Sequence, residues 1–466
     1  MENDRSAGPH FLVVSFYLQG HITPSLFLAK RLAGVAGVRV TFSTAVTSHR
    51  LIFPAAPAAG DDPVSYIPYS DGFDDKHDPD KYARGDYYYD RLNADAAKSL
   101  SAIVGDLAAA GRPVNCVIYS CFSTWAAVVA RKHGIQSVPL WTQPATAFAA
   151  YWHFFHGLES LVSANAGDRY FSVRFPGMPP LQICDLPSLL TVSKEDDWAC
   201  HLGPLRDMCA IMDSFDKKPK ILINTSTEME PHAISSVSNM VDVYAIGPML
   251  TEPAATAAAT LFDLDDKDYL QWLDTQPDDS VVYISFGSMR VLNKLEVEQI
   301  ARGLKDTGRP YLWVLRRDSG SPDVESPPTV AAEAEGKRLG MVVEWCDQVR
   351  VLEHRAVGCF VTHCGWNSTT EALAVGGVRM VGAPMWMDQA TNAWLMEKDW
   401  GIGVRAEVDR GGMLMAGELR RCVDEVMGSE EMGSKARQWK ETLGRAAAEG
   451  RVKQRIMEFV KDISSD

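Results

Sequence analysis

The sequence predicts an α/β protein of two domains, each a doubly wound parallel sheet of the Rossmann-like type covered by helices. Two observations favour this fold class. Short apolar runs rich in β-branched residues alternate with longer segments of helical periodicity along nearly the whole chain, which is typical of α/β units. The chain also has 466 residues, more than a single hydrophobic core usually organises.

The expected elements follow the alternation of apolar runs and helical segments. In the first half, strands are expected at Phe11–Phe16, Val38–Ser43, Cys116–Tyr119, Ser137–Trp141 and Lys220–Asn224, with helices that include Ile22–Leu32, Trp125–His133 and Ala145–Phe155. In the second half, strands are expected at Val281–Ser285, Tyr311–Leu315, Met341–Glu344, Cys359–Thr362 and Val378–Val381, with helices at Lys294–Leu304, Asn367–Val375, Gln389–Lys398 and Ala416–Met427.

The domain boundary is expected in a stretch of turn formers and small residues. Gly247, Pro248 and Pro253 are followed by the Ala- and Thr-rich run Ala254–Thr260, which has little periodicity. We therefore expect a first domain over residues 1–246, a linker over 247–275, a second domain over 276–446 and a final helix over 447–466.

Composition and charge exclude several classes of protein. The formal net charge of −14 argues against binding to nucleic-acid phosphates or anionic membranes. The polar N-terminus and the lack of an apolar run of about 18 residues predict a cytoplasmic protein without stable membrane insertion. The nine cysteines include no C-x-x-C pair and are expected to be buried thiols. Cys359 and Cys364 flank His363, but no second pair completes a tetrahedral set, so we expect no metal.

One segment of the second half has the features of a phosphate and ribose site. The expected strand ending at Thr362 runs into a glycine turn, and a helix is expected to open near Asn367. A helix N-terminus presents free N–H groups to an anion, and His363 can donate to the same anion. Glu371 lies one turn after Asn367 and Ser368, where its carboxylate can accept two sugar hydroxyls. Taken alone, these residues could equally be a helix cap and a dipole-complementing acid.

The surrounding residues favour the ligand-binding interpretation. The segment that includes Trp345-Cys-Asp-Gln348, His363-Cys-Gly365-Trp366-Asn367-Ser368, Glu371 and Pro384-Met-Trp386-Met-Asp388-Gln389 resembles the secondary-product motif of the plant family 1 UDP-sugar glycosyltransferases. The motif is long and specific. The resemblance implies the GT-B fold, in which two Rossmann-like domains face a central cleft and the C-terminal domain holds the nucleotide sugar. It also implies that the last helix crosses back to the N-terminal domain.

The resemblance implies a role for each residue of the motif. Trp345 would stack on the uracil, Gln348 and Glu371 would bind the ribose, and His363, Gly365, Asn367 and Ser368 would lie at the diphosphate. Trp366, Asp388 and Gln389 would contact the hexose, with Gln389 associated with glucose rather than galactose. Ser288, in Ser285-Phe286-Gly287-Ser288, would add a phosphate contact.

Two departures from the family motif lie close together. Gly376-Gly377 carries one extra residue, and Arg379 stands where proline is usual. Because they lie between a helix end and the next strand, we expect a local loop change with a left-handed glycine cap. Gly401-Ile-Gly403 has dinucleotide-motif spacing, but it is expected to be a turn before a strand.

The catalytic base is expected near the N-terminus. The first strand runs into Gln19-Gly20-His21-Ile-Thr-Pro24, followed by a helix, and this element resembles the one that carries the general base in the family. The family's orienting aspartate is replaced by Ser120. Either Ser120 or a water would then orient the imidazole, or the acceptor needs less help. Thr142 matches a family position near the sugar 6-hydroxyl.

The acceptor is less defined by the sequence. The aromatic residues Phe148, Tyr151, Trp152, Phe154 and Phe155 could line an apolar acceptor pocket or belong to the core. We expect inverting transfer of glucose from UDP-glucose to a small hydrophobic acceptor, carboxylic acids and phenols being favoured, by a monomer without a cofactor. Alternatives are another UDP-hexose as donor, a catalytically silent UDP-sugar-binding homologue, or a dinucleotide-dependent oxidoreductase.

Overall fold

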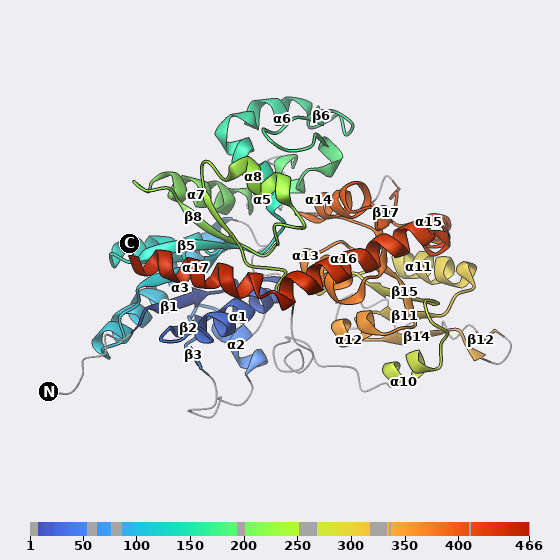
Figure 1. The fold of residues 1–466 in the computed structure, drawn as a ribbon, viewed down its shortest axis with the longest axis horizontal. Helices are drawn as coiled ribbons and strands as arrows, with labels where there is room; N and C mark the ends of the chain where they lie inside the picture. The colour runs from blue at the N-terminus through green and yellow to red at the C-terminus, as the bar shows by residue number, and fades with distance from the viewer. Residues whose placement is uncertain are drawn as a thin grey trace. The chain divides into compact units, whose positions relative to one another are not determined.

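The computed structural model describes residues 8–53, 63–75, 86–192, 201–250, 268–316, 333–334, 337–409 and 412–465. These form two compact units (Figure 1). The N-terminal unit holds the described residues up to 250 and those from Ala447 onward, and the C-terminal unit holds residues 268–446. Much of the expected linker, residues 251–267, lies outside the described residues.

The N-terminal unit is built on a seven-stranded parallel sheet with the order β3-β2-β1-β4-β5-β8-β9. Its strands are β1 (His10–Val14), β2 (Arg39–Ser43), β3 (Val64–Tyr66), β4 (Cys116–Ser120), β5 (Gln136–Trp141), β8 (Lys220–Ile223) and β9 (Asp242–Ala245), and a small hairpin is formed by β6 (Ser172–Val173) and β7 (Leu181–Gln182). Its helices are α1 (Gln19–Ala33), α2 (Val46–Ile52), α3 (Asp86–Ala109), α4 (Thr124–Lys132), α5 (Ala145–His153), α6 (Glu159–Asn165), α7 (Leu202–Asp213), α8 (Pro231–Val237) and α17 (Arg451–Ser465), with short turns at η2 (Phe154–Leu158), η3 (Ile183–Asp185) and η4 (Ser188–Leu190).

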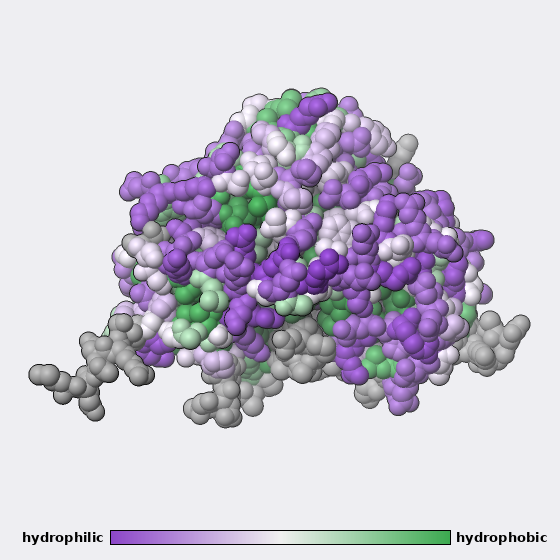
Figure 2. All heavy atoms as spheres, in the orientation of Figure 1, coloured by the Kyte–Doolittle hydropathy of each residue, from purple (hydrophilic) through white to green (hydrophobic). Residues whose placement is uncertain are grey.

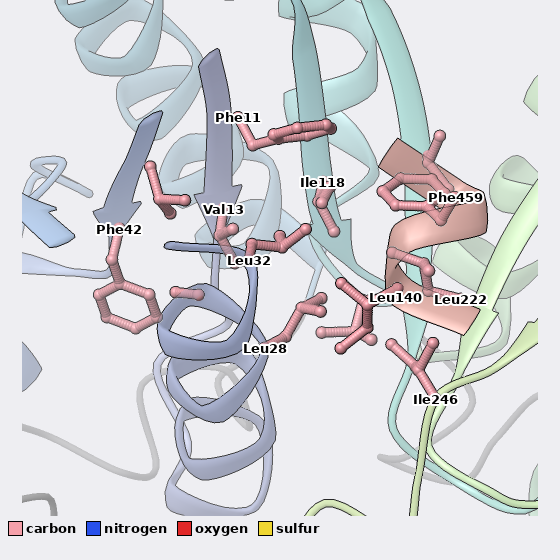
Figure 3. Close-up of a cluster of buried hydrophobic side chains, with 14 of the residues drawn as sticks. Phe11, Val13, Leu28, Leu32, Phe42, Ile118, Leu140, Leu222, Ile246 and Phe459 are labelled. Carbon is pink, nitrogen blue, oxygen red and sulfur yellow. The ribbon is translucent and has the colours of Figure 1, made fainter. Parts of the chain in front are cut away.

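The final helix completes the core of this unit. Helix α17 presents Ile456, Phe459, Val460 and Ile463 to the sheet, and all four are buried. Phe459 packs against Phe11 of β1, with ring centroids 5.8 Å apart (Figure 3). It also packs against Tyr244 of β9, with ring centroids 5.3 Å apart. Burying such side chains stabilises the fold by roughly 1.5–3 kcal/mol each, so this amphipathic helix belongs energetically to the N-terminal unit.

The C-terminal unit is built on a six-stranded parallel sheet with the order β14-β11-β10-β15-β16-β17. Its strands are β10 (Val281–Ser285), β11 (Tyr311–Val314), β14 (Gly340–Val343), β15 (Val357–Thr362), β16 (Arg379–Gly382) and β17 (Gly403–Arg405), and β12 (Glu333–Ala334) pairs with β13 (Lys337–Arg338). Its helices are α10 (Tyr269–Asp274), α11 (Lys294–Thr307), α12 (Gln348–Glu353), α13 (Trp366–Glu371), α14 (Gln389–Trp394), α15 (Ala416–Gly428) and α16 (Glu430–Ala448), with π turns at η6 (Ala372–Gly376) and η7 (Leu395–Asp399).

The predicted alternation of strands and helices is confirmed, with a few differences. The sequence analysis did not assign the edge strands β3 and β9, which are only three and four residues long. Residues 269–274, which were assigned to the linker, form helix α10 in the C-terminal unit. Gly401 lies in a turn as predicted, but strand β17 begins at Gly403, so the strand starts within the expected turn and not after it.

The face of the molecule shown in Figure 2 is predominantly hydrophilic, with apolar residues in scattered groups. No helix among the described residues is long and apolar enough to cross a membrane.

Candidate active site

His21 lies in the first turn of α1, at the carboxyl end of β1. The helix begins at Gln19, earlier than the sequence predicts, with Leu18 as its N-cap and Pro24 inside its first two turns. The backbone N–H of His21 donates to Leu18 O at 2.9 Å. Pro24 lies in the second turn, where it removes the N–H that would otherwise bond Gly20 O. The imidazole is therefore carried by regular helix and not by a loop.

Two hydroxyls from neighbouring strands meet one nitrogen of this imidazole. Ser120 Oγ, at the end of β4, lies 2.8 Å from His21 Nδ1, and Thr142 Oγ1, just after β5, lies 3.2 Å from the same atom. Because β4 and β5 are adjacent and parallel, their carboxyl ends reach the same edge of the sheet. No carboxylate among the described residues hydrogen-bonds to this ring.

The surroundings of His21 are apolar. The rings of Phe16 and Phe122 both meet the imidazole edge-on, with centroids 5.4 Å away. Burial lowers the pKa of His21 to about 4, so the ring is neutral at pH 7. A neutral imidazole with a hydroxyl acceptor at Nδ1 can carry its proton there and leave Nε2 free to accept another.

The aromatic run after Thr142 belongs mainly to the core. Phe148, Tyr151, Trp152 and Phe154 are each at most 3% exposed. Phe148 and Tyr151 pack edge-on against Trp141, at 5.6 and 5.8 Å. Of the two interpretations left open by the sequence, the structure favours the core for these four residues.

In the C-terminal unit, two glycine turns hold the ring of His363. β10 and β15 are adjacent and parallel, with Ser285 opposite Thr362, so the turns that follow them lie at one edge of the sheet. A Cβ on Gly287 would lie 2.6 Å from the His363 ring, and one on Gly365 would lie 2.4 Å from its Nε2. Only glycine permits this packing, because real Cβ contacts are not that short.

The electrostatics of His363 follow from this enclosure. Burial, and secondarily the positive charge of Arg290, lower the pKa of His363 to about 4. The ring is thus a neutral hydrogen-bond donor at pH 7. The backbone carbonyl of Ser288 accepts a hydrogen bond from the Arg316 guanidinium, which places further positive charge beside the turn after β10.

The helix after β15 starts one residue earlier than predicted. Gly365 is the N-cap of α13 and Trp366 is the first helical residue, so Asn367 and Ser368 lie inside the first turn and do not cap it. The Trp366 ring is 4% exposed and packs against Trp400 at 6.1 Å.

The predicted ribose residues form one hydrogen-bonded cluster. Gln348 Nε2 donates to Glu371 Oε2 at 2.6 Å and to Ser368 Oγ at 3.0 Å. Gln348 Oε1 accepts a hydrogen bond from Tyr283 OH at 3.2 Å. The sequence analysis missed Tyr283, because this residue lies in the middle of β10. Burial raises the pKa of Glu371 to about 7, while the Gln348 bond opposes the increase.

The predicted hexose residues are held by their own neighbours. Gln389 Oε1 accepts from the backbone N–H groups of Met385 and Trp386 at 2.9 and 3.3 Å, which leaves its amide NH2 available. Asp388 Oδ2 accepts from Asn392 Nδ2 at 2.7 Å, and the same nitrogen donates to Cys364 O at 2.7 Å. The sequence analysis did not assign Asn392, whose i, i+4 spacing from Asp388 is the signal that could have identified it.

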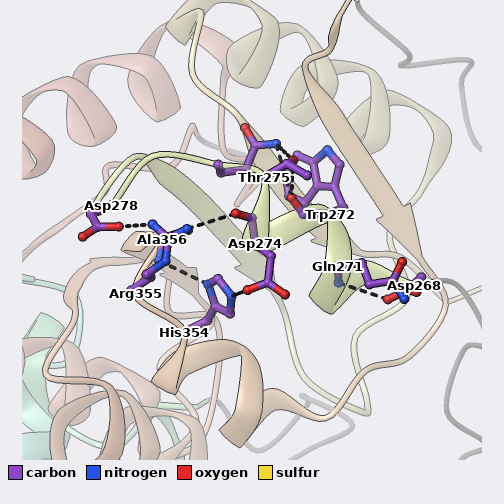
Figure 4. Close-up of polar contacts among 10 residues, drawn as sticks. Asp268, Gln271, Trp272, Asp274, Thr275, Asp278, His354, Arg355 and Ala356 are labelled. Carbon is purple, nitrogen blue, oxygen red and sulfur yellow. Dashed lines mark hydrogen bonds and ion pairs between the residues drawn. The ribbon is translucent and has the colours of Figure 1, made fainter.

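The turn that carries Trp345 is held in place by helix α10. Trp345 lies between β14 and α12, partly exposed, and the N–H of Asp347 donates to Tyr269 OH of α10 at 3.0 Å. α10 is fixed in turn, because Asp274 pairs with His354 at 3.1 Å and its carbonyl accepts from Arg355 at 2.9 Å (Figure 4).

Both departures from the motif have a structural explanation. Residues Ala372–Gly376 form a π turn ended by Gly377 at φ 62°, and a π turn accommodates one extra residue. Arg379 is buried and donates to Gly358 O at 3.1 Å and Met427 O at 3.2 Å, and it pairs with Asp279 at 2.5 Å. These contacts lie at the start of β16, so the change is local, as predicted.

Comparisons with known proteins agree with this architecture. Residues 224–432 match the family model described as UDP-glucoronosyl and UDP-glucosyl transferase. UDP-glycosyltransferase 75B1 of Arabidopsis thaliana is 38% identical, over 99% of this chain and 97% of the relative. Crocetin glucosyltransferase of Gardenia jasminoides is 36% identical, over 97% of each chain.

Solved structures show the same fold. Os79 from O. sativa in complex with UDP has 27% identity and a TM-score of 0.79, covering 97% of this chain and 100% of that one. UGT2 of Phytolacca americana, complexed with UDP-2fluoro-glucose and pterostilbene, has 25% identity and a TM-score of 0.80, covering 98% and 100%.

The two parallel-sheet units, together with the similarity to solved UDP-bound structures, define a GT-B glycosyltransferase. The chain belongs to the plant family 1 UDP-glycosyltransferases. The predicted fold, family, enzyme class and transfer of glucose from UDP-glucose to a small acceptor are confirmed, and the oxidoreductase interpretation is wrong. The roles of individual site residues stay predictions.

Proposed function

We propose that this enzyme transfers glucose, with inversion, from UDP-glucose to small acidic acceptors, carboxylic acids first and phenols second. The proposal rests on the hydrogen bonding of His21, whose Nδ1 contacts Ser120 Oγ and Thr142 Oγ1 and no carboxylate of the described residues. A carboxylate would stabilise the imidazolium that forms when the base takes a proton, whereas a hydroxyl does so only weakly.

The low basicity of His21 supports the same preference. With a pKa of about 4, this imidazole is poorly matched to a phenol with a pKa of about 10. A carboxylic acid with a pKa of about 4 is already ionised at pH 7, so it needs only to be positioned. Relatives named for crocetin and phloretin glucosylation support a small acceptor.

The donor side supplies the groups that a leaving diphosphate needs. The N-terminus of α13 and the neutral His363 donor favour a growing negative charge, so the residues present can stabilise UDP as it leaves. The hydroxyl or carboxylate oxygen of the acceptor would attack the anomeric carbon opposite to UDP in one displacement, which gives inversion. Cytoplasmic location and a monomeric state stay predictions from the sequence.

The test is His21→Ala assayed with a matched phenol and benzoate acceptor. We expect phenol transfer to fall by roughly 10²–10⁴ and benzoate transfer to fall far less. His232→Ala, at an exposed histidine of the same unit, is the matched control. Equal losses for both acceptors would refute proton abstraction by His21. Absence of any turnover of UDP-glucose by the wild type would instead favour a silent UDP-sugar-binding homologue.

Ser120→Asp provides the complementary measurement. Ser120 Oγ lies 2.8 Å from Nδ1, so a carboxylate at this position should raise the basicity of the ring, and phenol transfer should improve while benzoate transfer does not. An improvement of both acceptors by the same factor would show that Ser120 affects something other than base strength.

A further inference from the structure

A fully buried carboxylate, Glu230, lies outside the site described above. It is 2% exposed and precedes α8. Its two oxygens accept four hydrogen bonds: from Ala145 N at 2.9 Å, Thr146 N at 2.8 Å, Thr146 Oγ1 at 2.8 Å and Thr225 Oγ1 at 2.6 Å. Both backbone partners can only donate, so the geometry is that of an ionised acceptor.

These bonds tie the start of α5 to the end of β8. Ala145 and Thr146 are the first two residues of α5, whose N-terminal N–H groups have no helical partner and whose dipole favours an anion. Thr225 follows β8, whose neighbour in the sheet is β5. The carboxylate therefore links the start of α5, where the connection from β5 ends, to the residue Thr225 after β8.

That connection is the one that carries Thr142. It is only three residues long, Thr142 to Pro144, and it is held at both ends. On one side Trp141 O accepts from Asn224 N at 2.9 Å, and Trp141 Nε1 donates to Pro144 O at 2.9 Å. At the other end of the connection, Glu230 accepts hydrogen bonds from the first two residues of α5. Thr142 has little freedom left while both anchors hold, and its Oγ1 lies 3.2 Å from His21 Nδ1.

We propose that Glu230 is a positioning residue for the transfer reaction, which acts through α5 and Thr142 to hold the imidazole of His21. This inference rests on the proposed role of His21 as the base. The carboxylate touches neither reacting group. Its effect is geometric, because displacing a positioned group by about 1 Å can cost on the order of 10² in rate.

The test uses Glu230→Gln, which keeps the shape and replaces one acceptor oxygen by an NH2 group facing donors. We expect kcat with a phenol acceptor to fall roughly 10- to 100-fold. Benzoate transfer should change by less than about threefold, because a carboxylate acceptor does not need the base. The Kd for UDP, which lacks the sugar, should stay within about twofold, because the residues predicted to bind UDP lie in the C-terminal unit and keep their contacts. Glu228→Gln, two residues earlier in the same segment, is the matched control.

A double-mutant cycle with Thr142→Val separates positioning from general destabilisation. If Glu230 acts through Thr142, the double variant loses no more phenol activity than the more damaging single variant. Losses that multiply in kcat, or equal losses for phenol and benzoate, would overturn the inference. If Glu230→Gln does not fold, Thr146→Val removes one hydroxyl donor from the same carboxylate and enters the same cycle.

The His21→Ala assay distinguishes the two failures. If His21→Ala fails to discriminate between the acceptors, the proposed base is wrong whatever Glu230 does. If His21→Ala discriminates and the Glu230 cycle is additive, only the positioning role is refuted.

Discussion

Glu371→Gln should weaken UDP binding while leaving the fold intact or more stable. The side chain is partly buried, and this burial raises the pKa of Glu371 to about 7. In the predicted role its carboxylate accepts the ribose hydroxyls. The amide retains the shape and one acceptor oxygen, and it loses the charge.

The magnitude follows from the loss of a charged acceptor. A hydrogen bond to a charged group contributes about 1.5–3 kcal/mol, and tenfold in affinity corresponds to about 1.4 kcal/mol. Losing one such bond, at the carboxylate oxygen that the amide NH2 replaces, therefore predicts a rise of roughly 10- to 150-fold in the Kd for UDP.

The sign of the pH dependence is also fixed by the raised pKa. Protonation below about pH 7 removes the charged acceptor, so the wild-type Kd for UDP should rise as the pH falls from 8 to 6. The free energy of unfolding contributed by this group changes in the opposite direction: it is larger at low pH, where UDP binding is weaker. Because the folded pKa lies above the unfolded value of 4.5, this group's contribution to stability is full below pH 4.5 and is lost as the pH rises through about 7. Glu371→Gln should thus raise the Tm at pH 8.

Calorimetric titration with UDP at pH 6, 7 and 8, together with thermal unfolding, measures both effects. Glu353→Gln, at an exposed position of α12, is the control. An unchanged Kd, or the same pH dependence of the Kd in Glu371→Gln, would refute the assignment of this carboxylate to the ribose.

Three further predictions follow from the geometry. Gln389→His should shift the ratio of kcat/KM values toward UDP-galactose, because an imidazole cannot reproduce the bonds from Met385 and Trp386 to Gln389 Oε1; a constant ratio would contradict the hexose role. Gly365→Ala should weaken UDP binding by about tenfold, because its Cβ would displace the His363 ring. The control is Gly417→Ala, whose Cβ would meet no atom within 4 Å. Equal affinities of Gly365→Ala and the wild type for UDP would exclude a diphosphate contact by the His363 ring. With saturating UDP-glucose, kcat/KM for a phenol should show no inflection near pH 6.5 from His21, because the pKa of His21 is about 4. An inflection near pH 6.5 that disappears in His21→Ala would show that the imidazole has its ordinary pKa.

The sequence determined much of the C-terminal site, because its residues lie close together along the chain. Gln348, Ser368 and Glu371 belong to one continuous motif, and they form a single hydrogen-bonded cluster. Local signals also predicted the left-handed glycine cap, which is Gly377, but they did not predict the π turn that precedes it. The helix start at Gln19 was not predictable in the same way, since Pro24 and Gly20 are weak helix formers that the tertiary context overrides.

What the sequence by itself determined is the order of α/β units and the family, because periodicity and contiguous motifs are local properties of the chain. Tertiary structure alone decided which groups from distant segments meet. Ser120 and Thr142 share His21 Nδ1 across sequence separations of 99 and 121 residues. Glu230 reaches α5 across 84 and 85 residues. Such contacts depend on strand order and register, and both are fixed only when the sheet closes over its core.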